Sequence, residues 1–417
     1  MLIKEVDIAI VGGGPAGLAA AVKASELGTK EVLLIERDTE LGGILNQCIH
    51  DGFGLIRFKK QLSGCEYAQR FVNLVKDSLI KVMCNSMVIE INKNKEIYVA
   101  SKEYGFQIIK AKAVILSMGC RERTRSQVSI MGSRPAGVMS AGAAQKYINI
   151  DGYKPGNKAV ILGSGDIGLI MARRMTLEGM QVEGVYEVMQ NPGGLKRNIA
   201  QCLNDYDIPL HLSTTVTKVH GKKHIEGVSV AKVDENRKII EETTRYIPCD
   251  LLVLSVGLIP ENELSKNAGI ELDKVTKGPI IDDKNMTSIE GIFAAGNVVA
   301  VFDLVDYVSK SGENAAYGAV DYIENNYTEN KKVDVECGEN INFIIPQNIE
   351  VDRKDKSIDL FMRVKKSQDK VKVVVKCDDK VIKEERHQVI CPQEMIHVKF
   401  NVDDKLNENI KVEIVKG

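Results

Sequence analysis

Val6-Asp7-Ile8-Ala9-Ile10-Val11-Gly12-Gly13-Gly14-Pro15-Ala16-Gly17, near the beginning of the chain, determines its architecture. Residues 8–11 are apolar and β-prone, which is typical of a buried parallel strand. Gly12 permits a sharp turn, Gly14 leaves room for a pyrophosphate beside the backbone, and Gly17 lets the next helix pack close to the strand. The N–H groups at the start of that helix would hold the phosphate charge.

The residues after this turn complete a nucleotide-binding pattern. Residues 15–27 follow helical spacing, and residues 32–35 form a second apolar strand. Glu36 ends that strand, where a carboxylate accepts the hydroxyls of a ribose. A lone GxGxxG is a weak signal, but a preceding strand, a following helix and the distant acid favour dinucleotide binding over a plain glycine turn.

A second copy of the pattern begins in the middle of the chain. Residues 159–162 are apolar, Gly163-Ser164-Gly165-Asp166-Ile167-Gly168 is the turn, and Glu187 lies as far from Gly163 as Glu36 lies from Gly12. Residues 251–257 also mirror residues 114–119. The sequence therefore predicts an internal duplication in which each copy binds one dinucleotide.

Composition excludes several classes of function. The 417 residues carry a net charge of −1, which favours neither nucleic acid nor an anionic membrane as partner. No apolar run is long enough to span a bilayer, and the early apolar run is not a signal peptide. The nine cysteines are scattered without a CxxC pair, so we expect reduced thiols in a cytoplasmic protein.

The remaining patterns suggest three domains. We expect an amphipathic helix over 66–80, an antiparallel meander over 81–116 and a helix over about 312–327. From residue 331 the apolar residues alternate, which indicates an all-β domain, a small sandwich, that can fold alone. The predicted domains are residues 1–120 with 285–330 for the first nucleotide, 121–284 for the second, and 331–417 for the β domain.

With these motifs, the chain resembles the pyridine nucleotide-disulfide oxidoreductases. The glycine turns, the two glutamates and Ile292-Phe293-Ala294-Ala295-Gly296-Asn297 carry this resemblance. It implies an α/β fold of two Rossmann-like three-layer domains of the glutathione/thioredoxin reductase type, here followed by the all-β domain. It also implies that the first copy binds FAD and the second binds NAD(P)H.

A narrower resemblance rests on four stretches: residues 42–50, 119–123, 134–138 and 303–306. These are similar to the flavoprotein companion of anaerobic glycerol-3-phosphate dehydrogenase, which is itself similar to subunits of sarcosine oxidase, opine oxidase and hydrogen cyanide synthase. This resemblance implies a dehydrogenase flavoprotein subunit and a small cysteine-containing redox protein as partners, and a possible homo-oligomer.

Site residues follow from the family resemblance, position by position. The FAD contacts that it implies are Gly12, Gly14, Pro15, Ala16, Gly17, Glu36, Arg37, Gly42, Gly43, Val88, Gly119, Gly296 and Asn297. The NAD contacts that it implies are Gly163, Gly165, Asp166, Ile167, Gly168, Glu187 and Gly257. Asn replaces the usual Asp at position 297, and its carbonyl oxygen can still accept a hydrogen bond. The helix near 312–316 would direct its N-terminus at the flavin.

No catalytic residue is established by the sequence. Disulfide reductases of this fold carry two neighbouring cysteines, whereas Cys48 stands alone, so dithiol chemistry is not expected. Cys48 is a candidate for a redox thiol, and the alternative is a small buried residue that lines the loop. His50 is a candidate for a proton donor, and the alternative is a side chain that anchors the loop by a hydrogen bond. The arginines at 121, 123, 125 and 134 either grip an anionic partner or the nicotinamide pyrophosphate, or form a solvated loop.

Glu187 predicts the choice of nicotinamide. A carboxylate about 4 Å from a 2′-phosphate repels it by roughly 4 kcal/mol per unit charge at an effective dielectric constant of 20, which favours NADH. Lys196 and Arg197 lie farther along the chain and could fold back, which would favour NADPH.

Three functions remain open from the sequence. The first is an FAD-dependent, NAD(H)-linked oxidoreductase subunit that exchanges electrons with a partner. The second is a non-catalytic FAD- and NAD-binding assembly subunit of an amine or imino-acid oxidase-like complex. The third is a single-cysteine NADH oxidase or peroxidase. We expect the β domain to mediate assembly with a dehydrogenase subunit or with a second copy of this chain, and to be dispensable for nucleotide binding.

Overall fold

The computed structural model describes residues 3–324, 331–351, 357–377, 380–401 and 409–417. It divides into two compact units, Met1–Cys120 with Pro260–Gly417, and Arg121–Ile259. The chain leaves the first unit through β9 (Cys120–Glu122) and returns through β19 (Leu258–Pro260), and these two strands pair. Where the first unit is interrupted, the N–H of Glu261 donates to the carbonyl oxygen of Gly119 at 3.0 Å.

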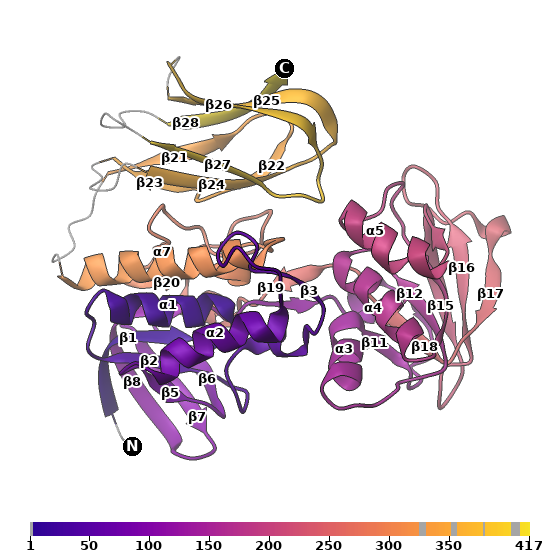
Figure 1. Cartoon of the computed structure of the whole chain (residues 1–417), viewed down its shortest axis with the longest axis horizontal. Helices are drawn as coiled ribbons and strands as arrows, with labels where there is room; N and C mark the ends of the chain where they lie inside the picture. The colour runs from indigo at the N-terminus through magenta and orange to yellow at the C-terminus, as the bar shows by residue number, and fades with distance from the viewer. Residues whose placement is uncertain (1–2, 325–330, 352–356, 378–379, 402–408) are drawn as a thin grey trace. The chain divides into compact units, whose positions relative to one another are not determined.

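A mixed sheet forms the centre of the first unit (Figure 1). Its strand order is β5-β2-β1-β8-β7-β6, and β20 also pairs with β8. The strand bounds are β1 Ile3–Val11, β2 Val32–Ile35, β5 Lys81–Met83, β6 Ser86–Ile91, β7 Glu96–Ser101, β8 Gly105–Leu116 and β20 Ile292–Ala294. The nucleotide-type strands β1, β2, β5, β8 and β20 are parallel, and β6-β7-β8 form an antiparallel meander.

Helices α1 (Pro15–Glu26), α2 (Gly64–Lys76) and α7 (Val305–Glu324) pack with this sheet. Figure 1 shows α1 and α7 side by side. They approach closely at Gly312, because this residue has no side chain. A Cβ added there would lie 2.1 Å from the carbonyl oxygen of Ala16. Helix α2 begins with a capping box, in which Ser63 and Glu66 each accept a backbone N–H of the other.

The second unit has three layers. Its central sheet is parallel in the order β11-β18-β12-β13-β14, with helices on one face and the sheet β10-β15-β16-β17 on the other. The bounds in this unit are β10 Met131–Gly132, β11 Val138–Ser140, α3 Ala141–Asn149, β12 Lys158–Leu162, α4 Asp166–Leu177, β13 Gln181–Tyr186, α5 Lys196–Cys202, β14 Leu210–His211, β15 Thr214–His220, β16 Gly227–Lys232, β17 Arg245–Pro248 and β18 Leu251–Leu254. In β12, Ala159 and Ile161 pack towards the helices and Val160 and Leu162 towards the second sheet, so both faces are buried.

The C-terminal strands form two packed sheets, β23-β21-β28-β25-β26 and β22-β24-β27, around a core of their own. Their bounds are β21 Lys332–Cys337, β22 Ile341–Ile345, β23 Asn348–Glu350, β24 Ser357–Val364, β25 Gln368–Cys377, β26 Lys380–Ile390, β27 Ile396–Asn401 and β28 Ile410–Lys416. The predicted fold class, two Rossmann-like three-layer domains with an all-β C-terminal domain, is confirmed.

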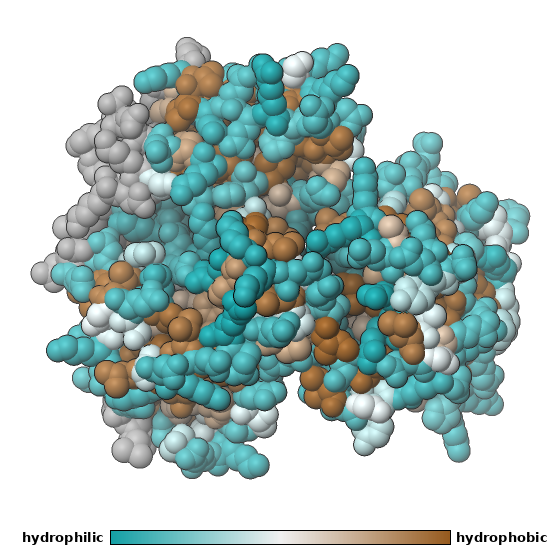
Figure 2. Space-filling model, in the orientation of Figure 1, coloured by the Kyte–Doolittle hydropathy of each residue, from teal (hydrophilic) through white to brown (hydrophobic). Residues whose placement is uncertain are grey.

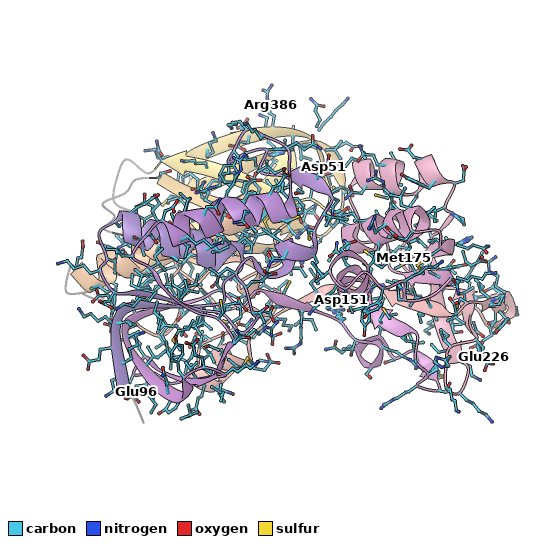
Figure 3. The ribbon with its side chains drawn as sticks, turned by 60° about the horizontal axis from the view of Figure 1, so that its bottom comes forward. Asp51, Glu96, Asp151, Met175, Glu226 and Arg386 are labelled. Carbon is cyan, nitrogen blue, oxygen red and sulfur yellow. The ribbon has the colours of Figure 1, made fainter. Side chains whose placement is uncertain are left out.

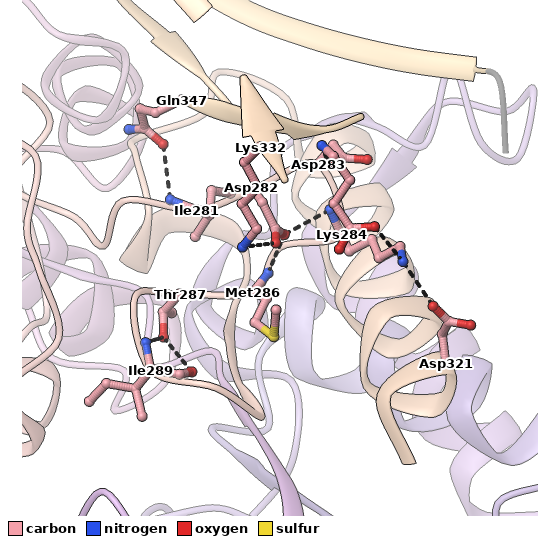
Figure 4. A network of polar contacts seen from close by, with 11 residues as sticks. Ile281, Asp282, Asp283, Lys284, Met286, Thr287, Ile289, Asp321, Lys332 and Gln347 are labelled. Atoms are coloured by element: carbon pink, nitrogen blue, oxygen red, sulfur yellow. Dashed lines mark hydrogen bonds and ion pairs between the residues drawn. The ribbon is translucent and has the colours of Figure 1, made fainter. Parts of the chain in front are cut away.

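The β domain is tied to the rest of the first unit by polar contacts (Figure 4). Lys332 pairs with the buried Asp282 at 2.8 Å, and the Gln347 side chain accepts the N–H of Ile281 at 3.1 Å. Burial raises the pKa of Asp282, although the Lys332 cation opposes that effect. This domain is therefore joined to the flanking segment 281–284 as well as through the chain.

Several elements differ from the sequence-based expectations. Residues 260–284, expected in the second domain, lie in the first unit, because helix α6 (Glu263–Ala268) places Ala268 in its core. Residues 81–83 form a parallel strand beside β2 and not part of the meander, because Lys81 pairs in register with Leu33. Helix α7 begins at Val305, not near Gly312, so Gly312 lies inside the helix and serves close packing.

Figure 2 shows that most of the visible surface is hydrophilic, with hydrophobic residues in scattered groups. None of the helices in the described part of the chain combines the length and the apolar character of a transmembrane span.

Candidate functional site

The first glycine turn has the geometry of a pyrophosphate cradle. Gly12 adopts φ +106°, and an added Cβ would lie 2.5 Å from the carbonyl oxygen of Ser117. At Gly17 an added Cβ would lie 1.9 Å from the carbonyl oxygen of Gly12, so helix and strand touch there. At Gly14, by contrast, an added Cβ would meet nothing within 4 Å. The turn is therefore packed against the protein's own backbone at Gly12 and Gly17 and is open at Gly14, which fits a dinucleotide phosphate at the start of α1.

Glu36 is fixed at the end of β2. Its side chain is buried, Oε2 accepts the N–H of Gly13 at 2.6 Å, and Oε1 accepts the N–H of Asp38 at 2.8 Å. Each carboxylate oxygen has a second lone pair, so the group can still accept ribose hydroxyls. Arg37 follows on the surface, and β6 begins beside Glu36, whose carbonyl accepts the N–H of Ser86 at 2.9 Å. Val88 is buried in that strand.

The second glycine pair lies against the first turn. The N–H of Gly42 donates to the carbonyl oxygen of Gly13 at 2.9 Å, and an added Cβ at Gly43 would lie 3.0 Å from the Cα of Gly14. The structure therefore brings together the Gly14 and Gly43 positions that the sequence predicted to share one cofactor.

Residues from late in the chain close the same site. An added Cβ at Gly296 would lie 2.8 Å from the Cβ of Ala16, which is in the first turn of α1. The side-chain oxygen of Asn297 accepts the N–H of Phe302 at 3.0 Å, while the side-chain nitrogen of Asn297 donates to the Sγ of Cys120 at 3.6 Å. Gly119, next to that cysteine, has open space where its Cβ would be.

The second glycine turn repeats the first in detail. Gly163 has φ +96°, and an added Cβ would lie 2.0 Å from the carbonyl oxygen of Ser255, the counterpart of Ser117. An added Cβ at Gly168 would also clash with Ser255, at 2.7 Å from its Cβ. The buried Glu187 accepts the N–H of Ser164 at 2.9 Å and the N–H of Met189 at 2.9 Å, as Glu36 does in the first copy. These shared contacts support two homologous nucleotide sites, one in each unit.

The chain that follows β13 folds back onto the second turn. Asp166, beside Ile167 at the start of α4, accepts the N–H of Leu195 at 2.8 Å. Helix α5 begins at the next residue, so Lys196 and Arg197 are exposed within two residues of this contact. The backbone before these two cations thus contacts the second turn through Asp166.

The serines that follow the two central strands were missed as site residues. The Ser117 hydroxyl donates to the carbonyl oxygens of Val11 and Gly12 at 2.8 and 3.0 Å, and the Ser255 hydroxyl accepts the N–H of Gly168 at 3.1 Å. The repeated Ser-x-Gly pattern at residues 117–119 and 255–257 is the sequence signal that could have identified them.

Cys48 has the environment of a structural thiol. Its side chain is buried, its Sγ donates to the carbonyl oxygen of Ile44 at 3.3 Å, and burial raises the pKa of the thiol to about 12. The Sγ of Cys65 donates to the carbonyl oxygen of Cys48 at 3.8 Å, a contact that the sequence did not predict. His50 packs against Phe53 at 5.2 Å between ring centroids. These contacts favour the structural roles of Cys48 and His50 over the redox and proton-donor roles.

The four arginines that the sequence predicted as one cluster differ in their contacts. Arg125 donates to the carbonyl oxygens of Ile130 and Met131 at 3.2 and 2.6 Å, so it braces its own loop. Arg123 lies beside Gly257, with its side chain 3.9 Å from where a Cβ would be. Arg121 and Arg134 are exposed.

Comparisons with known proteins agree with this geometry. A family model described as pyridine nucleotide-disulphide oxidoreductase matches residues 6–321. The chain is 28% identical over 284 residues to the HcnB component of hydrogen cyanide synthase from Pseudomonas protegens, covering 63% of this chain and 58% of that protein. It is 25% identical to one of the opine oxidase subunits of Agrobacterium tumefaciens (70% and 61% covered) and 28% identical to one of the alkyl hydroperoxide reductase subunits of Staphylococcus aureus (78% and 60% covered). The chain thus spans about three fifths of the length of these relatives.

Solved structures give the same fold. The T. acidophilum thioredoxin reductase aligns with a TM-score of 0.61 at 24% identity, covering 76% of this chain and 98% of that one. The Bacillus cereus bacillithiol disulfide reductase aligns with a TM-score of 0.62 at 16% identity, covering 78% and 100%. At these identities the likeness is one of fold.

Fold and paired glycine turns define a flavoprotein with two dinucleotide-binding domains. The chain belongs to the pyridine nucleotide-disulphide oxidoreductase family, whose members bind FAD and use NAD(P)H. The resemblance to hydrogen cyanide synthase and opine oxidase subunits is confirmed, and that to the glycerol-3-phosphate dehydrogenase companion stays a prediction. The open space at Gly14 and Gly119 and the fixed Glu36 carboxylate fit FAD in the first site.

Proposed function

We propose that this chain is an FAD-dependent oxidoreductase subunit that takes electrons from NADH and passes them to a partner redox protein. The observation that carries the proposal is the pair of equivalent turns, each with an anchored glutamate, in one chain. When bound, FAD accepts a hydride from the nicotinamide. The residues of the chain position the two nucleotides, and hydride transfer itself needs no further acid or base.

Glu187 supports NADH as the reductant. Its carboxylate is buried at the end of β13 and held by two backbone N–H groups, so it cannot swing away from a 2′-phosphate. Lys196 and Arg197 are the competing feature, because α5 begins beside the same turn.

The physiological partner that we propose is a dehydrogenase flavoprotein of the glycerol-3-phosphate type, with a small cysteine-containing protein as an electron carrier. The motif 303–306 and the resemblance around Cys48 support this choice. We place the protein in the cytoplasm, in line with nine cysteines that are all thiols in the structure.

A second candidate function is a non-catalytic subunit. It is favoured by the names of two relatives, which are subunits of hydrogen cyanide synthase and of opine oxidase. Its FAD and NAD would then be structural. The third candidate, an oxidase or peroxidase that uses Cys48, has less support because burial raises the pKa of this thiol to about 12.

Anaerobic stopped-flow mixing with NADH separates these functions. Rapid loss of the visible absorbance of oxidised flavin, faster with NADH than with NADPH, is the expected result. A flavin that stays oxidised in excess NADH would exclude the first function and leave the structural one. Peroxide turnover that disappears in Cys48→Ser would instead select the third.

A further inference from the structure

The segment that leads into α7 is held by the C-terminal β domain. Asp303 stands two residues before α7, and its carboxylate forms an ion pair with the guanidinium of Arg363 in β24. The other carboxylate oxygen accepts the N–H of Met395 at 2.5 Å, and Arg363 also donates to the carbonyl oxygen of Val301 at 3.2 Å. The two charged side chains are only 17% and 18% exposed.

Arg363 is itself fixed within the β domain. Its other guanidinium nitrogen donates to the carbonyl oxygens of Pro392 and Gln393 at 3.1 and 2.9 Å. An arginine can satisfy this set because its planar fork presents five N–H donors, whereas a lysine has three on a single nitrogen. The β domain therefore presents a preorganised cation to Asp303.

The neighbouring residues on β24 contact the same region. Asp359, Phe361 and Arg363 alternate along the strand and so share one face. Asp359 pairs with Lys310 of α7 at 2.6 Å, and the Phe361 ring packs edge-on against Phe302 at 5.4 Å. This face of β24 is the one that contacts residues 301–310.

Residues 301–304 adjoin the proposed flavin site. Asn297 accepts the N–H of Phe302, and Gly296 lies against Ala16 at the start of α1. Both Gly296 and Asn297 are among the predicted FAD contacts. A shift of Asp303 would therefore move the backbone that joins these contacts to α7.

The charge of Asp303 matters as well as its position. The N-terminus of a helix carries partial positive charge, and an aspartate beside it would normally interact with that end. Here both oxygens of Asp303 face the β domain and Arg363 neutralises the charge. Asp306, the other acid at this end, accepts the N–H of Arg57 at 2.9 Å. The charge of Asp303 is thus neutralised by the β domain, while Asp306 remains as the acid in the first turn of α7.

We propose that Arg363 is a positioning residue for the flavin, which acts through Asp303 on FAD affinity and on the reduction potential. This inference rests on the proposed function insofar as FAD occupies the first site. It makes the C-terminal domain part of the flavin-binding unit, contrary to the expectation that this domain is dispensable for nucleotide binding.

The test is Arg363→Met in the full-length protein, with Arg386→Met as matched control. Arg386 is an exposed arginine on β26 of the same domain (Figure 3). Removing Arg363 should weaken FAD binding to the apoprotein about tenfold, measured by flavin fluorescence, because the lost charge-assisted bond no longer holds Asp303 and the backbone that joins Gly296 and Asn297 to α7. It should also make the midpoint potential more negative, because an unpaired Asp303 disfavours the more negative reduced cofactor. A tenfold change in the redox equilibrium corresponds to about 30 mV.

Charge-matched variants distinguish positioning from simple stabilisation. Arg363→Met combined with Asp303→Asn should return the potential to the wild-type value, and Arg363→Lys should restore part of the affinity. Asp303→Asn alone should make the potential more positive, because the Arg363 cation is then no longer neutralised. This variant also tests the proposal should Arg363→Met fail to fold.

The inference is overturned if Arg363→Met lowers only the thermal midpoint while FAD affinity and potential equal those of Arg386→Met. An unchanged potential in Asp303→Asn would overturn it too. Both quantities are measured without NADH, so failure here is distinct from a wild-type flavin that NADH does not reduce, which would refute the proposed function alone.

Discussion

Gly14 and Gly17, three residues apart, use the absence of a side chain in opposite ways. Gly17 makes room for the protein's own backbone, whereas Gly14 faces open space. Gly14 has φ −77°, a conformation that any residue adopts, so a side chain can be placed there without backbone strain. The same holds for Gly165 in the second turn, at φ −65°. Substitutions at these two positions therefore report on ligands more than on folding.

Gly14→Glu should give a folded but colourless protein, because a carboxylate would occupy the pyrophosphate position. Gly165→Glu is the matched variant and should retain about one FAD per chain while losing reduction by NADH. Flavin content after gel filtration and stopped-flow reduction measure the two effects. Normal flavin content in Gly14→Glu would show that the first turn is not the FAD site.

Glu187→Gln should reduce the preference for NADH over NADPH by about tenfold or more, because the repulsion of a 2′-phosphate is removed. The amide oxygen can still accept the N–H of Ser164, and the bond from the N–H of Met189 is lost. Glu183→Gln on the same strand, which pairs with Lys158 at 3.2 Å, is the control. A wild-type preference for NADPH would mean that Lys196 and Arg197 dominate.

At the scale of elements, repeated local patterns were predictable and long-range packing was not. Both glycine turns follow from the local needs of backbone and phosphate, and the structure has them as expected. The start of α7 was predicted near Gly312 and lies at Val305. The sequence around Val305 and Asp306 does not indicate a helix by itself, and Asp306 is fixed by a long-range hydrogen bond from the N–H of Arg57. Cys48 and Cys65 could not be related from spacing, because the contact depends on α2 packing against the 42–48 loop.

Strand β24 allows a pH test of the docking face. Burial would raise the pKa of Asp359, but hydrogen bonds from His397 and Lys310 outweigh it and lower the pKa to about 2. Because the folded-state pKa lies below the unfolded value of about 3.9, the stabilisation is present above pH 4 and is lost as the pH falls towards 2.

Asp359→Asn should therefore destabilise the protein by about 1–2 kcal/mol at pH 7, discounted for partial exposure. The difference from wild type should shrink as the pH falls from about 4 towards 2 in thermal unfolding. Asp369→Asn, at an exposed position on β25, should have no such effect. An equal loss of stability at every pH would contradict the ion-pair explanation.

On the scale of the whole molecule, the number of electrons that one chain takes up shows which groups are redox-active. We expect reductive titration to need about two electrons per chain, because only the flavin accepts them. Cys48 and Cys65 direct their sulfur atoms to different carbonyl oxygens, of Ile44 and of Cys48. Uptake of about four electrons that returns to two in Cys65→Ser would instead mean that these cysteines form a redox disulfide.

The hydrogen bond between Gly119 and Glu261 places the two ends of the interruption side by side. The unit Arg121–Ile259 is therefore inserted at one place in the chain of the first unit. Because Gly119 and Glu261 are adjacent, the inserted unit can be replaced by a short glycine-serine linker between them. The shortened protein should still bind FAD and be yellow. Other nucleotide-binding domains could then be grafted at the same point to change the reductant.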